Sequence, residues 1–157
     1  MTINLTQKER LLLEDQKKHE EICIQKYTSY ANQAQDPQLK QMFNNHAQHE
    51  RQHLNTINQI LAGQVPNVQS QSMQQGQQPN IHNQGQPGMG LTNANDAVLC
   101  NDLLMTEKFV SGTYDTAIFE MTDTNVRKAL NHIQKEEQQH GEDIFNYMKS
   151  KGMYNPQ

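Results

Sequence analysis

Hydrophobic residues recur at intervals of three and four in four long stretches of the chain, and this spacing places them on one face of an α-helix. The pattern predicts helices over residues 6–34, 36–61, 95–121 and 123–151. The same stretches show almost none of the strict alternation that is typical of β-strands. The sequence therefore predicts an all-α protein, an antiparallel four-helix bundle made of two helical hairpins.

Capping residues support the predicted helix ends. A Thr-x-x-Glu capping box begins the first helix at Thr6. Asp36 and Pro37 separate the first two helices, with Asp36 as the N-cap and Pro37 in the first turn. Gly63 and Gly152 follow the second and the fourth helix, where a glycine commonly ends a helix.

Residues 64–93 differ sharply in composition from the helical stretches. They are mostly Gln, Asn, Gly, Pro and Ser and contain no Asp, Glu, Lys or Arg. Such a segment has too little apolar surface to offset the entropy lost on ordering, so we expect a flexible linker that can cross the length of the bundle. The predicted organisation is one domain over residues 1–157, with one hairpin in residues 1–63 and a second in residues 94–157.

The overall composition argues against several classes of function. The chain has 157 residues, is 34% hydrophobic and carries a net charge of −4 without a basic run, which argues against a nucleic-acid or anionic-membrane surface. No apolar run is long enough to span a bilayer, and the first residues do not resemble a secretory signal peptide, so we expect a cytoplasmic protein without membrane insertion. Cys23 and Cys100 are too few for a disulfide framework. We expect both to be buried small side chains, and the sequence leaves open whether they pair.

Each predicted helix carries one carboxylate inside its hydrophobic face. These are Glu20, Glu50, Glu107 and Glu137. In the second and fourth helices a histidine follows three residues later, at His53 and His140. Residues three apart share a helix face, so each glutamate and its histidine can point at one spot.

The two hairpins repeat this pattern at a fixed offset of 87 residues. The corresponding pairs are Glu20 and Glu107, Tyr27 and Tyr114, Asp36 and Asp123, Glu50 and Glu137, and His53 and His140. A single Glu-x-x-His is weak evidence of a metal site. Two of them, each with a matched upstream glutamate and tyrosine, indicate a duplicated structural unit.

Four carboxylates and two imidazoles inside a bundle would repel one another and lose hydration if they stayed unpaired. Two divalent metal ions remove that cost. The set is that of dimetal bundles, in which two helices each give a Glu and the other two each give Glu-x-x-His. Mixed oxygen and nitrogen ligation suits iron or manganese, so we predict about two Fe or Mn ions per chain, with zinc in a misloaded site. The alternative is a metal-free buried network in which carboxyl groups share protons.

Five neighbouring side chains carry weaker expectations. His46 lies near the inward face of its helix, whereas His49 and Glu136 are expected to face solvent. Tyr27 and Tyr114 are candidates for contact with the metal ligands, and the alternative is that both are ordinary core aromatics.

Two resemblances to known families add to this interpretation. Glu20, with "KYTSYANQA" at 26–34 and "MFNNHAQHERQH" at 42–53, resembles the rubrerythrin and ferritin-like superfamily, which implies a ferritin-like bundle and dimetal chemistry. Residues 103–156 resemble the Coat F family of spore coat proteins, through "YDTAIFE", "HIQKEEQQHGE" and "NYMKSKGMYN". The second resemblance implies a protein that is made in the mother-cell cytoplasm of an endospore-forming bacterium and deposited on the spore coat. Its expected partners are other coat proteins or a second copy of itself, as a homodimer.

Two hypotheses of function follow. The first is a structural or assembly protein of the spore coat without catalytic residues, in which bound metal ions would hold the bundle together. The second is a dimetal redox protein that consumes peroxide or oxygen, as rubrerythrins and manganese catalases do. Rubrerythrins carry a rubredoxin-like cysteine module that this chain lacks. We therefore favour the structural role.

Overall fold

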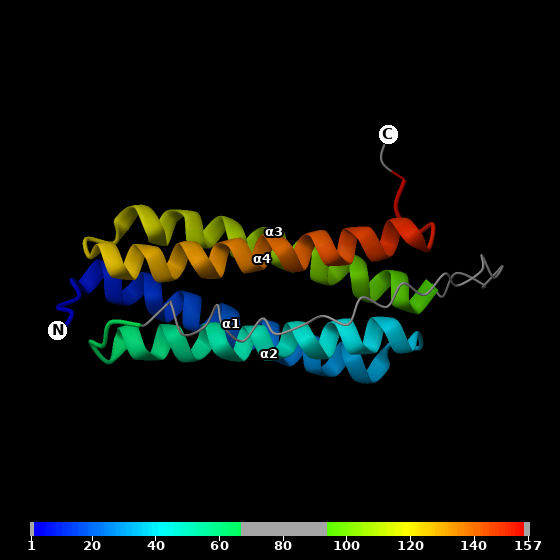
Figure 1. Ribbon diagram of the computed structural model, residues 1–157, viewed down its shortest axis with the longest axis horizontal. Coiled ribbons are helices and arrows are strands. Elements are labelled where there is room, and N and C mark those ends of the chain that lie inside the picture. Colours follow the sequence, from blue (N-terminus) through cyan, green and yellow to red (C-terminus); the bar gives the residue numbers. More distant parts are fainter. Residues whose placement is uncertain (1, 67–93, 156–157) are drawn as a thin grey trace.

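The computed structural model describes residues 2–66 and 94–155, which form a bundle of four helices (Figure 1). The helices are α1, Gln7–Gln33; α2, Pro37–Leu61; α3, Ala94–Glu120; and α4, Thr124–Ser150. Helices α1 and α2 pack together as one hairpin, and α3 and α4 pack as a second hairpin against it. The predicted all-α bundle of two hairpins is confirmed, and each predicted helix is present.

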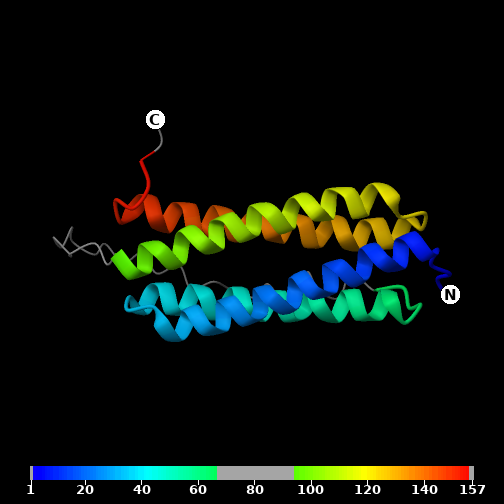
Figure 2. The ribbon, with the colours of Figure 1, turned by 180° about the vertical axis from the view of Figure 1, so that it is seen from behind.

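Helix α2 ends and α3 begins at opposite ends of the bundle (Figures 1 and 2). The chain therefore passes from one hairpin to the other by a crossover, and α3 runs antiparallel to α1. Residues 67–93, most of the predicted linker, lie outside the described part of the chain. None of the helices described is long and apolar enough to cross a membrane.

Two buried carboxylates tie each hairpin to the turn of the other. Glu9, at the start of α1, accepts hydrogen bonds from the backbone N (2.7 Å) and the hydroxyl (2.8 Å) of Thr122, in the turn between α3 and α4. Asp96, at the start of α3, accepts hydrogen bonds from the backbone N of Gln35 (2.9 Å) and of Asp36 (3.1 Å), between α1 and α2. Glu9 and Asp96 are 87 residues apart, as are Gln35 and Thr122. The sequence repeat is thus a repeat of tertiary contacts.

Capping residues lie at the helix termini where the sequence predicted them. Thr6 and Glu9 form the capping box, with the Glu9 N–H donating to Thr6 Oγ1 at 3.2 Å. Asp36 caps α2 and Asp123 caps α4, each by accepting backbone N–H groups with its side chain. Gly63 follows α2 with a φ of 80°, a backbone conformation that side-chain-bearing residues rarely adopt.

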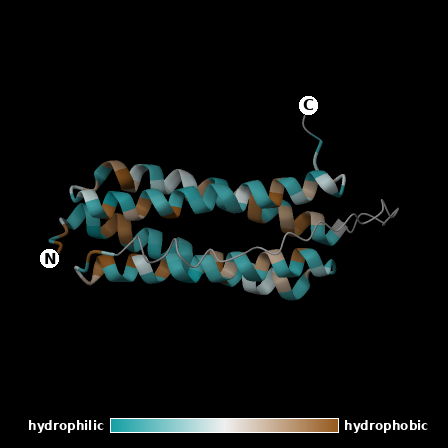
Figure 3. Ribbon diagram, viewed as in Figure 1, coloured by the Kyte–Doolittle hydropathy of each residue, from teal (hydrophilic) through white to brown (hydrophobic). Residues whose placement is uncertain are grey.

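The interior consists of two apolar clusters, one toward each end of the bundle. The first includes Leu13, Ile57, Ile60, Val126, Leu130 and Ile133. The second includes Ala31, Leu39, Phe43, Leu103, Ile144 and Met148. Figure 3 shows hydrophobic residues concentrated where the hairpins face each other, whereas hydrophilic residues dominate the outward side of α2 and α4. Cys23 and Cys100 are buried free thiols within these clusters. The apolar clusters leave a polar region between them at the middle of the bundle.

Candidate metal centre

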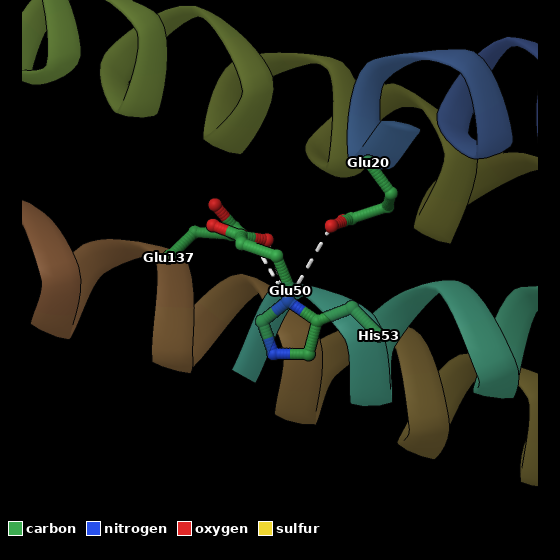
Figure 4. Close-up of side chains that lie close together, drawn as sticks. All are labelled: Glu20, Glu50, His53 and Glu137. Carbon is green, nitrogen blue, oxygen red and sulfur yellow. Dashed lines mark hydrogen bonds and ion pairs between the residues drawn. The ribbon is translucent and has the colours of Figure 1, made fainter. Parts of the chain in front are cut away.

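Six polar side chains meet in the middle of the bundle, and each of them is at most 2% exposed. They are Glu20 from α1, Glu50 and His53 from α2, Glu107 from α3, and Glu137 and His140 from α4. Figure 4 shows Glu20, Glu50, His53 and Glu137 pointing toward one another from three helices. The structure thus brings together every residue that the sequence singled out as a candidate ligand.

The six residues form two adjacent groups. One group consists of Glu20, Glu50, His53 and Glu137, and the other of Glu50, Glu107, Glu137 and His140. Within each group, ligand atoms from the four residues all lie within 4.8 Å of one another. We call these groups the His53 position and the His140 position. Both groups contain Glu50 and Glu137, so these two carboxylates would be shared if cations bound at both positions.

The histidines present their Nδ1 atoms to the carboxylates. His53 Nδ1 lies 2.8 Å from Glu137 Oε1, 3.1 Å from Glu50 Oε2 and 3.6 Å from Glu20 Oε2. His140 Nδ1 lies 3.2 Å from Glu50 Oε1 and 3.3 Å from Glu107 Oε1. A single N–H can donate one good hydrogen bond, so it cannot satisfy three surrounding carboxylates.

Four of the buried carboxylate oxygens accept no hydrogen bond. They are Glu20 Oε2, Glu107 Oε2 and both oxygens of Glu137. Each unsatisfied buried acceptor costs about 1–3 kcal/mol, and more when it is charged. A divalent cation between these oxygens would neutralise them and provide their missing partner. The donor set, with four carboxylates and two imidazoles, therefore fits a pair of such ions.

Two buried tyrosines connect the hairpins beside this cluster. The Tyr27 hydroxyl donates to Glu107, and the Tyr114 hydroxyl donates to Glu20. Each tyrosine belongs to one hairpin and its carboxylate to the other. The structure thus brings both tyrosines into contact with candidate ligands and fixes the orientation of Glu20 and Glu107.

The pKa shifts of the four carboxylates differ in direction: the pKa is raised for the two shared carboxylates and lowered for the other two. Burial raises the pKa of Glu50, and the charge of Glu20 raises it further. Burial raises the pKa of Glu137 as well, together with the charges of Glu50 and Glu107. Burial would also raise the pKa of Glu20, but the adjacent His53 imidazole favours the anion more strongly, so this pKa is lowered.

The same balance applies to Glu107 and His53. Burial would raise the pKa of Glu107, but the neighbouring Glu137 and His140 side chains lower it to about 2. Burial would lower the pKa of His53, but the hydrogen bond to Glu136 and the adjacent carboxylate of Glu137 raise it well above its usual value. These shifts favour the protonated forms of Glu50, Glu137 and His53, and a metal ion bound there would compete with those protons.

Three further side chains surround the cluster, and the sequence analysis did not assign them to it. Glu136 Oε2 lies 2.5 Å from His53 Nε2, and His49 Nδ1 lies 3.0 Å from His140 Nε2. His46 is buried and stacks on His140 with ring centroids 4.2 Å apart. His49 and Glu136 were expected to face solvent, but both are only partly exposed. The repeat offered a signal, because His49 and Glu136 are also 87 residues apart and each directly precedes a Glu-x-x-His.

Residues 95–157 match the family model of the Coat F domain. The match covers α3 and α4 and confirms the resemblance found at residues 103–156. The comparisons with curated proteins and with solved structures returned no match. The likeness of the bundle to ferritin-like proteins therefore stays a prediction.

Proposed function

We propose that the protein is a structural component of the spore coat whose bundle is held together by two divalent metal ions, iron or manganese. The observation that carries this proposal is the set of unpaired carboxylate oxygens buried between two imidazoles at the centre of the bundle. The Coat F match supports the location, and the donor set supports the choice of metals.

Metal ions in these positions would cross-link the two hairpins. The His53 position draws ligands from α1, α2 and α4, and the His140 position draws them from α2, α3 and α4. An ion that binds only the folded state stabilises it by mass action, by about 2.7 kcal/mol when the free ion is at 100 times its Kd.

Exposed apolar side chains support the assembly part of the proposal. Val98, Met105, Phe109 and Phe119 on α3 are each more than 60% exposed. Exposed apolar groups that form a contiguous patch mark surfaces that contact other proteins. We therefore propose that the partners are other coat proteins or further copies of this chain.

The first experiment is elemental analysis of the protein after anaerobic reconstitution with Mn(II) and removal of unbound ions. We expect about two ions per chain in the parent and none in the Glu50→Ala/Glu137→Ala variant, which lacks both shared carboxylates. The matched control is Glu21→Ala/Glu142→Ala, which removes two exposed carboxylates from α1 and α4 and should keep both ions. A parent without stoichiometric metal would contradict the metal part of the proposal.

The coat location has a separate test. A tagged copy, produced in a spore-forming host under sporulation control, should be recovered in the extracted coat fraction and absent from the spore core. Recovery in the core alone would contradict the coat assignment, whatever the metal content.

A second function, the consumption of peroxide or oxygen, is favoured by a pocket of about 270 Å³ between α1 and α3. Cys23 contributes to its lining, and burial together with the charge of Glu50 raises the pKa of its thiol. Cys23 is thus a residue of the pocket wall that is close enough to be affected by the charge of the cluster. Peroxide turnover by the Mn-loaded parent, compared with Glu50→Ala/Glu137→Ala, tests this function. Equal turnover in both proteins would exclude it.

A further inference from the structure

The two candidate metal positions have matching ligands but different surroundings. In each position the histidine presents Nδ1 to the carboxylates and Nε2 to the outside of the cluster. His53 Nε2 lies 2.5 Å from a carboxylate oxygen of Glu136. His140 Nε2 lies 3.0 Å from the Nδ1 atom of His49. Since His49 and Glu136 occupy equivalent places in the repeat, one hairpin supplies an imidazole where the other supplies a carboxylate.

The carboxylate on the His53 side is itself held in place. The second oxygen of Glu136 lies 3.2 Å from His132 Nε2, one helical turn away on α4, and the Glu136 side chain is only 17% exposed. Glu136 therefore bridges two imidazoles and keeps one oxygen on His53. It is in position to accept a hydrogen bond from the Nε2–H group of His53 whenever Nδ1 binds a metal.

The His140 side is surrounded by aromatic rings. The ring of His46 stacks on His140 at a centroid distance of 4.2 Å, and the ring of His49 lies parallel to it at 5.3 Å. Asp143 is the nearby carboxylate, but its Oδ2 atom lies 2.9 Å from His46 Nε2 and is hydrogen-bonded to that ring. Among the described contacts, His140 Nε2 has His49 as its hydrogen-bond partner and no carboxylate.

The identity of the outer partner changes how strongly a histidine binds metal. An imidazole that coordinates through Nδ1 carries its proton on Nε2 and donates it outward. A carboxylate acceptor forms a charge-assisted hydrogen bond, which orients the ring and makes Nδ1 more basic. A neutral imidazole acceptor gives a weaker bond and adds no negative charge. Loss of such an outer partner typically lowers metal affinity by about 10–100-fold.

We propose that the His53 position binds a divalent ion more tightly than the His140 position, so that the two ions load in a fixed order and the second exchanges more readily. Glu136 and His49 are positioning residues that set this difference. The inference rests on the proposed dimetal centre. It would give the spore coat one permanent structural ion and one that follows the metal content of its surroundings.

Calorimetric titration of the metal-free full-length protein with Mn(II) tests the order. We expect two binding steps. Two steps alone do not identify the positions, because the first ion reduces the negative charge of the shared carboxylates and so weakens binding of the second at either position. The assignment therefore depends on variants. His53→Ala should abolish the tighter step and His140→Ala should leave it, with far-UV circular dichroism confirming that both variants remain helical.

Conservative variants of the outer partners provide the sharper comparison. Glu136→Gln should weaken the tighter step by about 10–100-fold, whereas His49→Gln should leave that step unchanged. In the exchanged variant His49→Glu/Glu136→His, the tighter step should depend on His140 instead of His53. Equal effects of Glu136→Gln and His49→Gln on the tighter step would overturn the inference while the dimetal centre stands. A parent that binds no Mn(II) would overturn both.

Discussion

The carboxylates at the centre of the bundle determine how stability depends on pH in the absence of metal. Glu50, Glu137 and His53 have pKa values above their ordinary ones in the folded protein. Each group therefore contributes stability that is complete below its ordinary pKa and is lost as pH rises through the folded-state pKa. The metal-free protein should lose stability where this loss is not offset by other groups.

We predict that the free energy of unfolding of the metal-free protein falls as pH rises above about 7, which is above the ordinary pKa of histidine. The lowered pKa values of His46 and His49 therefore do not oppose the trend. Urea unfolding in the presence of a chelator measures it. The Glu50→Gln/Glu137→Gln variant should show a shallower fall because its amides do not titrate. A rise in stability with pH across this range would contradict the assignment of protons.

The two tyrosines provide a second prediction at the scale of single residues. Tyr27→Phe and Tyr114→Phe each remove a hydroxyl that donates to a buried carboxylate in the opposite hairpin. Because the contacts are equivalent in the repeat, each change should lower the free energy of unfolding of the metal-free protein by a similar amount, about 1–3 kcal/mol. Urea midpoints measure this. The control is Tyr154→Phe, at an exposed position, which should have no effect. A loss confined to one of the two variants would show that the halves are not equivalent here.

At the scale of the helices, Glu9 and Asp96 hold the turns of the opposite hairpins. We predict that Glu9→Ala lowers the free energy of unfolding by about 1–3 kcal/mol, because two donors of Thr122 and the N–H of Thr6 lose their acceptor. Hydrogen exchange should accelerate in the α3–α4 turn. Asp96→Ala should accelerate exchange at Gln35 and Asp36 instead. Glu14→Ala, on the exposed face of α1, is the control, and the same exchange pattern in all three variants would contradict the pairing.

The contribution of Glu9 also has a defined pH range. Burial would raise its pKa, but hydrogen bonds from Thr122 and Thr6 lower it to about 2. A lowered pKa gives stability that is present above the ordinary value and is lost as pH falls through the folded-state value. Stability lost between about pH 4.5 and pH 2 should therefore be smaller in Glu9→Ala than in the parent, as measured by thermal unfolding.

The helices could be predicted closely because each carries a regular apolar stripe between recognisable caps. The burial of residues at the edge of an apolar stripe could not be predicted in this way. His49 and Glu136 were expected to face solvent, but both are only partly exposed. Each of these two residues precedes a candidate ligand glutamate by one position, which is about 100° around the helix. Their burial depends on how closely α2 approaches α4, and the hydrophobic pattern of one helix does not contain that information.

The six candidate ligands could be predicted for a different reason. A carboxylate in the middle of an apolar stripe conflicts with the local pattern, and such conflicts mark functional sites. The repeat then paired the conflicting residues across the two halves. Whether metal ions occupy the centre stays a prediction that elemental analysis has to decide.

At the scale of the whole molecule, the contacts between hairpins should hold the bundle together without a continuous chain. A protease site introduced between residues 66 and 94 allows the chain to be cut there after folding. We predict that the two fragments co-elute on size exclusion, because the Tyr–Glu contacts and the apolar clusters lie between α1, α2, α3 and α4. Loading with Mn(II) should raise the urea concentration that separates them. Separation under native conditions would contradict the prediction, and the uncut protein treated with inactive protease is the control.

The exchange of Tyr–Glu contacts across the repeat has a consequence for how this molecule can change by mutation. A single hairpin that pairs with an identical copy could form the same reciprocal contacts, but every substitution would then appear on both sides at once. In one continuous chain, positions 49 and 136 mutate separately, and here they carry His49 and Glu136. Because both halves belong to one chain, the residue beside each candidate histidine ligand can change independently by mutation. An assembly of identical hairpins does not allow this.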